Sequence, residues 1–144
     1  MFEVDFRYLE QFLIALGLMS LTVLINSVGM NWVRLYYRRF WSREARYRSR
    51  RMVMVGIAAI MLAVHCVEVL VWALFFFLRG IVPTWLSAMY YSLASYSTLG
   101  ESNIALPDHW RGLGGFEAMN AMLMFGWSTA ILATVVMKLH SLDE

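Results

Sequence analysis

Residues 84–107 read TWLSAMYYSLASYSTLGESNIALP, and this stretch decides the fold predicted for the chain. It opens with an apolar, aromatic-rich run, Trp85–Tyr96, that has a helical composition but is too short to cross ~30 Å of hydrocarbon. The run breaks at Ser97-Thr98-Leu99-Gly100, continues through the polar Glu101-Ser102-Asn103 and reaches Pro107. A long apolar segment stands on each side of it. In a membrane protein this order predicts a re-entrant loop, in which a short helix dips into the bilayer and an extended chain returns along a water-filled axis.

The composition places the chain in the membrane class. Of its 144 residues, 60% are hydrophobic and only 15% are charged, whereas soluble domains carry about 25% charged residues. The length suits a single compact unit. The one cysteine, Cys66, lies in an apolar run and supports neither a disulfide framework nor a metal motif.

Two long apolar segments precede the loop, within residues 1–37 and over residues 52–78, and each is long enough to span a bilayer. The first carries Asn26; the second carries His65 and Glu68, which share one helix face because they are three residues apart. Ionisable side chains inside a membrane are rare and by default functional. Two interpretations stay open: Glu68 is a packing residue bonded to His65 or Asn26, or it gates or senses protons.

An arginine-rich loop, residues 38–51, is predicted between these segments. Eight of the chain's 12 basic residues lie in or next to it: Arg34, Arg38, Arg39, Arg43, Arg46, Arg48, Arg50 and Arg51. The positive-inside rule places this loop in the cytoplasm and the N-terminus outside. Basic residues at this position are also expected to contact anionic lipid headgroups. We expect no nucleic-acid partner.

A third apolar segment, residues 116–138, follows the loop and precedes a short tail, residues 139–144. By parity the tail is cytoplasmic, which Lys138 supports, so the protein is expected to be a multi-pass protein of a cell or bacterial inner membrane.

Residues 52–138 resemble the pore module of tetrameric potassium channels of the two-transmembrane and tandem-pore type. The resemblance is carried by a pore helix at 84–96 with the aromatic pair Tyr90-Tyr91, then by Thr98-Leu99-Gly100 in place of the family's T-[VIL]-G-Y-G-D. Downstream, residues matching the family's P…R…E spacing are Pro107, Arg111 and Glu117.

The resemblance implies an all-α membrane fold with an outer helix at 52–78, a re-entrant pore helix, a filter at 97–103 and an inner helix at 116–138. The first span is additional to this module. Four copies would enclose one pore, so the partner is the chain itself, as a homotetramer. An aromatic cuff is expected to support the pore helix, formed by Trp85, Tyr90, Tyr91 and Tyr96. The resemblance also implies that the inner helix lines the pore, with Asn120 and Ser128 as candidate lining residues and Gly126 as a candidate hinge.

The filter departs from the family pattern at Glu101-Ser102-Asn103, where the family has Tyr-Gly-Asp. Thr98 and Leu99 would still supply hydroxyl and carbonyl oxygens, while four Glu101 side chains would form an acidic ring for a permeant cation such as K⁺, Na⁺ or Ca²⁺. This predicts a cation channel with altered selectivity, weakly selective among monovalent ions or permeable to divalent ones.

An alternative stays open, in which Glu101 points behind the filter toward Arg111 or the pore-helix aromatics. The protein would then be a non-conducting regulatory or structural subunit. The sequence contains no hydrolytic, redox or phosphate-binding motif, so we expect neither an enzyme nor a cofactor beyond ions in the pore.

Overall fold

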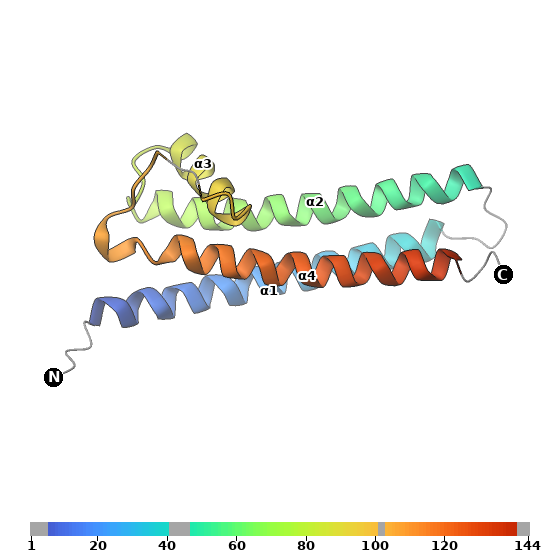
Figure 1. Ribbon diagram of the computed structural model, residues 1–144, viewed down its shortest axis with the longest axis horizontal. Helices are drawn as coiled ribbons and strands as arrows, with labels where there is room; N and C mark the ends of the chain where they lie inside the picture. Colours follow the sequence, from blue (N-terminus) through green and yellow to red (C-terminus); the bar gives the residue numbers. More distant parts are fainter. Residues whose placement is uncertain (1–5, 41–46, 101–102, 141–144) are drawn as a thin grey trace.

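The computed structural model describes residues 6–40, 47–100 and 103–140. Over these residues all regular secondary structure is helical. In chain order the elements are α1 (Phe6–Phe40), α2 (Tyr47–Leu78), α3 (Trp85–Tyr96), the 3₁₀ turn η1 (Asp108–Trp110) and α4 (Leu113–His140). Three long helices lie side by side, and short α3 lies against α2 and α4 near the end where α1 begins (Figure 1). We call this end the α3 end and the opposite end, where α1 stops and α4 finishes, the far end.

Three segments of the described chain are long and apolar enough to cross a membrane: Tyr8–Phe40, Arg51–Leu78 and Asp108–Lys138. At a rise of about 1.5 Å per residue, each exceeds the ~30 Å hydrocarbon thickness. Large apolar side chains such as Leu24, Leu62 and Leu123 are exposed along them, as contact with lipid requires. The predicted all-α membrane fold is confirmed.

The helices extend beyond the apolar segments at the far end. α1 continues to Phe40 and α2 starts at Tyr47, so Arg38, Arg39 and Arg51 are helical rather than part of a loop. The physical reason is local: residues 34–51 contain no glycine or proline, and arginine is a good helix former. Arg43 and Arg46 lie outside the described residues.

The Gly-rich segment before the third span is also helical. α4 begins at Leu113, three residues earlier than predicted, and Gly114 and Gly115 belong to its first turn. Gly114 is needed there for packing, because a Cβ at this position would lie 2.3 Å from the Tyr91 hydroxyl oxygen. The absence of a side chain thus lets the first turn of α4 press against α3.

Apolar side chains fill the interior at both ends. At the α3 end the core includes Trp72, Phe76 and Tyr91, with Leu113 from the first turn of α4. At the far end a second cluster joins α1, α2 and α4, and it includes Met30, Val33, Ile57 and Val135. Between these two apolar clusters lies a band of buried polar side chains, and this band positions the candidate site.

Candidate functional site

The short helix α3 has two different faces. One face is packed inside the protomer, and the other is apolar but exposed. Thr84 caps its start, accepting a hydrogen bond from the Ser87 backbone N–H at 3.2 Å. Ala88, Ser92 and Tyr96 lie on the buried face. Leu86 and Leu93 are 79% and 57% exposed on the other.

Beyond α3 the chain folds back over the helix end. The Thr98 N–H donates to the Ser95 carbonyl at 3.0 Å, and the Gly100 N–H donates to the Ala94 carbonyl at 3.1 Å. Thr98 has φ +60° and Gly100 has φ +67°. Glycine adopts this region freely, whereas a β-branched residue does so only with strain of about 1–3 kcal/mol, which concentrates at functional sites. Residues 97–100 are exposed on the protomer.

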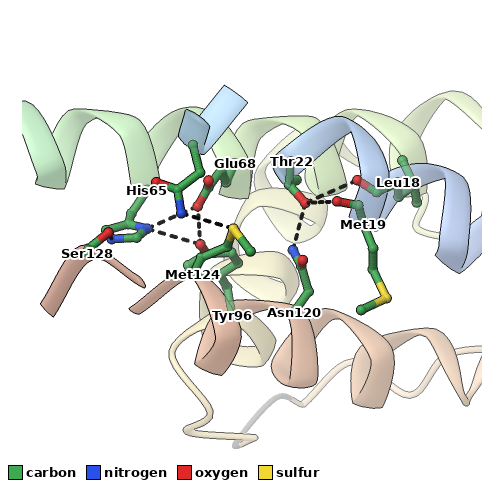
Figure 2. A network of polar contacts seen from close by, with 10 residues as sticks. Leu18, Met19, Thr22, His65, Glu68, Tyr96, Asn120, Met124 and Ser128 are labelled. Atoms are coloured by element: carbon green, nitrogen blue, oxygen red, sulfur yellow. Dashed lines mark hydrogen bonds and ion pairs between the residues drawn. The ribbon is translucent and has the colours of Figure 1, made fainter. Parts of the chain in front are cut away.

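Tyr96, the last residue of α3, belongs to a polar cluster that joins three helices (Figure 2). Its hydroxyl donates to Oε2 of Glu68, a side chain that is fully buried on α2. His65 Nδ1 lies 3.0 Å from the same oxygen, and His65 Nε2 lies 3.1 Å from Ser128 Oγ on α4. One proton assignment satisfies all three contacts: Tyr96 and His65 Nδ1 donate to Glu68, and Ser128 donates to His65 Nε2.

A second polar contact holds α3 one turn earlier. Ser92 Oγ donates to the Val69 backbone carbonyl of α2 at 2.9 Å and also contacts Oε1 of Glu117, which is fully buried on α4. Ser92 and Tyr96 are four residues apart, so both contacts lie on one face of α3. That face is thereby bonded to α2 at two successive turns and to α4 at the first of them, which fixes where the chain leaves α3.

The additional helix α1 joins α4 through polar contacts of its own. Asn120 Nδ2 donates to Thr22 Oγ1 at 2.9 Å, and Asn26 Nδ2 approaches the Met124 sulfur at 3.0 Å. In Figure 2 the Thr22 and Asn120 side chains point toward one another between the two helices. Both pairs advance by four residues on each helix, so α1 and α4 are connected at two successive turns.

In this arrangement the short helix α3 packs against two spanning helices, α2 and α4, and the chain returns to the end of the molecule where α3 lies. The amino-acid sequence of this region matches a family model. The model is described as "Ion channel", and it covers residues 64–138, just over half of the chain. The chain belongs to the ion channel family. Residues 64–138 are therefore a potassium-channel-type pore module, and α1 lies outside the matched region. Comparisons with curated proteins and with solved structures find no match.

The four aromatic residues that were predicted to support the pore helix differ in burial. Tyr91 and Tyr96 are buried, and their rings contact Phe76 and Phe125 with centroids 5.1 and 5.4 Å apart. Trp85 contacts Phe77 at 5.9 Å at the start of the helix.

The remaining aromatic, Tyr90, is half-exposed on the outward face of α3. Asn103, the last residue of the predicted filter, is also exposed. Of the predicted cuff, Tyr91 and Tyr96 are buried within the chain and Trp85 has a ring contact with α2, whereas Tyr90 faces outward.

The predicted pore-lining residues of the inner helix require a correction. Asn120 is fully buried against Thr22 of α1, and Ser128 is buried against His65 of α2, so neither side chain faces a surface that could line a pore. The cause is packing inside the protomer, which uses both polar groups. Gly126 is exposed within a continuous α4, and its role as a hinge stays a prediction.

Of the two partners considered for Glu68, the structure brings His65 to it and not Asn26, whose amide nitrogen contacts Met124.

Three functional-site residues were not singled out from the sequence: Thr22, Ser92 and the buried acid Glu117, which entered only through a spacing match. The predicted start at residue 116 placed Glu117 at the end of the helix, whereas α4 begins at Leu113 and places this acid inside it.

Glu101 and Ser102, on which the predicted change of selectivity rests, lie outside the described residues. Among the described residues, a cavity of ≈ 460 Å³ lies between the end of α3, the returning chain and the first turns of α4, lined by Thr98, Gly100, Leu106, Gly114 and Arg111, among others. Arg111 Nη2 lies 3.4 Å from Asp108 Oδ1, one turn away. A contact between Glu101 and Arg111 stays a prediction.

Proposed function

We propose that this ion channel protein is a homotetrameric cation channel, in which ions pass a ring of Glu101 carboxylates and then the Thr98–Gly100 segment. One observation carries the proposal: the family's re-entrant helix is held at its last residue, Tyr96, by a buried acid on α2. Ser97, where the predicted filter begins, follows that residue directly. The anchor supports the proposal because it holds the helix end directly before the predicted filter.

The orientation of α3 favours a cation. A helix of 12 residues is about 18 Å long, so α3 reaches roughly the middle of a ~30 Å hydrocarbon layer when it starts at one interface. Its C-terminus carries a partial negative charge from the aligned peptide dipoles. Four such ends around one axis would stabilise a dehydrated cation where the bilayer itself opposes it most.

The tetramer is supported by the surface that each protomer leaves uncovered. A single re-entrant loop encloses no path, whereas rotational symmetry around the loop does. Large apolar side chains are exposed on α3 and on the neighbouring face of α4, among them Leu86, Leu93, Met119 and Met122. They offer a contact surface for neighbouring subunits close to the predicted filter.

Altered selectivity follows from Glu101-Ser102-Asn103. A carboxylate ring attracts divalent as well as monovalent cations, and Ser102 replaces a glycine whose conformational freedom the potassium-channel filter uses. The arginine count at the far end supports an external N-terminus, so that ions would meet Glu101 from the outer side.

Flux of K⁺, Na⁺ and Ca²⁺ into liposomes that contain the purified full-length protein tests the proposal. We expect cation flux in wild type, and in Glu101→Gln a loss of divalent relative to monovalent flux. Glu10→Gln is the matched control, because Glu10 is an exposed acid at the same end but on α1. Absence of flux in every gradient would refute conduction and favour the non-conducting subunit; equal flux ratios in both variants would remove Glu101 from the ion path.

A further inference from the structure

A groove of ≈ 630 Å³ lies at the far end between α1 and α4, away from the re-entrant helix. α1 contributes Asn31, Arg34 and Arg38, and α4 contributes Ile131, Thr134 and Lys138. On both helices these positions follow a spacing of three and then four residues, so each helix turns one continuous face to the groove. The groove is therefore built by two helices, one of which lies outside the channel module.

The groove concentrates positive charge. Arg34, Arg38 and Lys138 all line it, and none of the described residues that line it is acidic. Arg34 and Arg38 are exposed and stand one helical turn apart, so their guanidinium groups can hold two oxygens of one phosphate group. Thr134 adds a hydroxyl at the same level, although its proton is directed to the Ala130 carbonyl at 2.9 Å.

Apolar side chains alternate with the basic residues along the groove. Val33 and Val135 form buried parts of the lining, and Leu35 and Ile131 flank the basic residues. Tyr37 also lines the groove, and a tyrosine with one apolar and one polar end suits the headgroup level of a membrane. A free phosphate ion would use the basic residues only, whereas a phospholipid uses both kinds of surface.

We propose that this groove is a binding site for an anionic phospholipid of the leaflet at the far end. Its phosphate lies between Arg34, Arg38 and Lys138, and its acyl chains contact Leu35 beside the arginines and Ile131, which lies one turn nearer the bilayer centre than Thr134. Basic pockets between transmembrane helices are known to take anionic headgroups, and a basic residue near the surface strengthens such binding about 5-fold. The site requires α1, and it does not depend on ion conduction.

Native mass spectrometry of the full-length protein in detergent, titrated with phosphatidylglycerol or phosphatidylcholine, tests the site. We expect tight retention of phosphatidylglycerol and about 30-fold weaker retention in the double variant Arg34→Gln/Arg38→Gln. Arg39→Gln is the matched control, because Arg39 is exposed in the same turn of α1 but does not line the groove. The control is expected to retain the lipid as wild type does.

A second variant, Thr134→Trp, keeps every charge and fills the groove, and we expect it to lower phosphatidylglycerol retention as well. This variant separates the groove from a general effect of surface charge. Equal losses in the Arg39→Gln control and the double variant would overturn the proposal, as would wild-type retention in Thr134→Trp. Equal retention of phosphatidylcholine, or displacement of the lipid by inorganic phosphate, would also overturn it.

Discussion

Replacing Tyr96 by phenylalanine tests the polar cluster that anchors the end of α3. The substitution keeps the ring contact with Phe125 and removes only the hydroxyl that donates to Glu68. Glu68 is fully buried, its Oε2 keeps His65 as a donor, and its Oε1 has no hydrogen-bond partner among the described residues. The lost hydrogen bond therefore leaves a buried carboxyl group with a single donor.

Two sets of hydrogen-bond energies bound the loss of unfolding free energy expected for Tyr96→Phe. Hydrogen bonds to charged groups contribute about 1.5–3 kcal/mol in soluble proteins, whereas bonds between helices in a membrane average about 0.6 and reach about 1.7 kcal/mol. Because the acceptor here is a buried acid with one remaining donor, we place the cost near the overlap, at about 1.5 kcal/mol. That cost corresponds to roughly a tenfold change in the unfolding equilibrium.

Unfolding of the full-length protein by sodium dodecyl sulfate in mixed micelles measures this cost. Tyr90→Phe is the control, because Tyr90 lies on the exposed face of the same helix, and we expect less than about 0.5 kcal/mol. In a double-mutant cycle with Glu68→Met, the double variant should cost at least about 0.5 kcal/mol less than the sum of the single variants. Equal costs for Tyr96→Phe and Tyr90→Phe, together with additivity in the cycle, would refute the cluster as an anchor.

Two further substitutions probe the helix contacts around this anchor. Ser92→Ala removes the hydroxyl beside the buried Glu117 and should destabilise the protein by about 1–2 kcal/mol in the same assay. The control Ser20→Ala, at an exposed position, should change stability by less than about 0.5 kcal/mol. Equal effects of the two substitutions would contradict the contact between Ser92 and Glu117. Gly29→Ala should cost about 1–3 kcal/mol, because its Cβ would lie 2.3 Å from a side-chain carbon of α2. Gly17→Ala, with nothing within 4 Å, should be neutral or stabilising by up to about 1 kcal/mol, and a neutral Gly29→Ala would show that the two helices separate readily.

The spanning helices and the re-entrant helix could be predicted from the sequence because their signals are local. Length and apolar composition suffice for the spans, and the short run Trp85–Tyr96 between two breaks suffices for α3. The ends of the helices were less predictable. Hydrophobicity marks where the bilayer is, whereas a helix continues through charged residues such as Arg38 until its backbone conformation changes.

The direction in which a buried polar group points could not be predicted. A polar residue in an apolar span indicates an interior position, but Asn120 and Ser128 had two possible interiors, a pore and the protomer's own helix interfaces. The decisive fact is the packing of α1 against α4, which brings Thr22 within 2.9 Å of Asn120 across 98 residues of sequence. A pattern read within one helix contains no information on that contact.

The two faces of α3 differ in their contacts: the inward face has polar contacts with other helices, and in the described part of the chain the outward face does not. Ser92 and Tyr96 use the inward face of α3, and both of their contacts are made within one protomer. The outward face, with Leu86 and Leu93, makes no comparable polar contact among the described residues and stays apolar and exposed. The contacts that orient the re-entrant helix thus lie within one chain, and in the proposed tetramer the outward face is the surface available for contacts between subunits. Changes on the inward face should therefore alter the stability of the protomer, whereas changes on the outward face should alter how subunits associate.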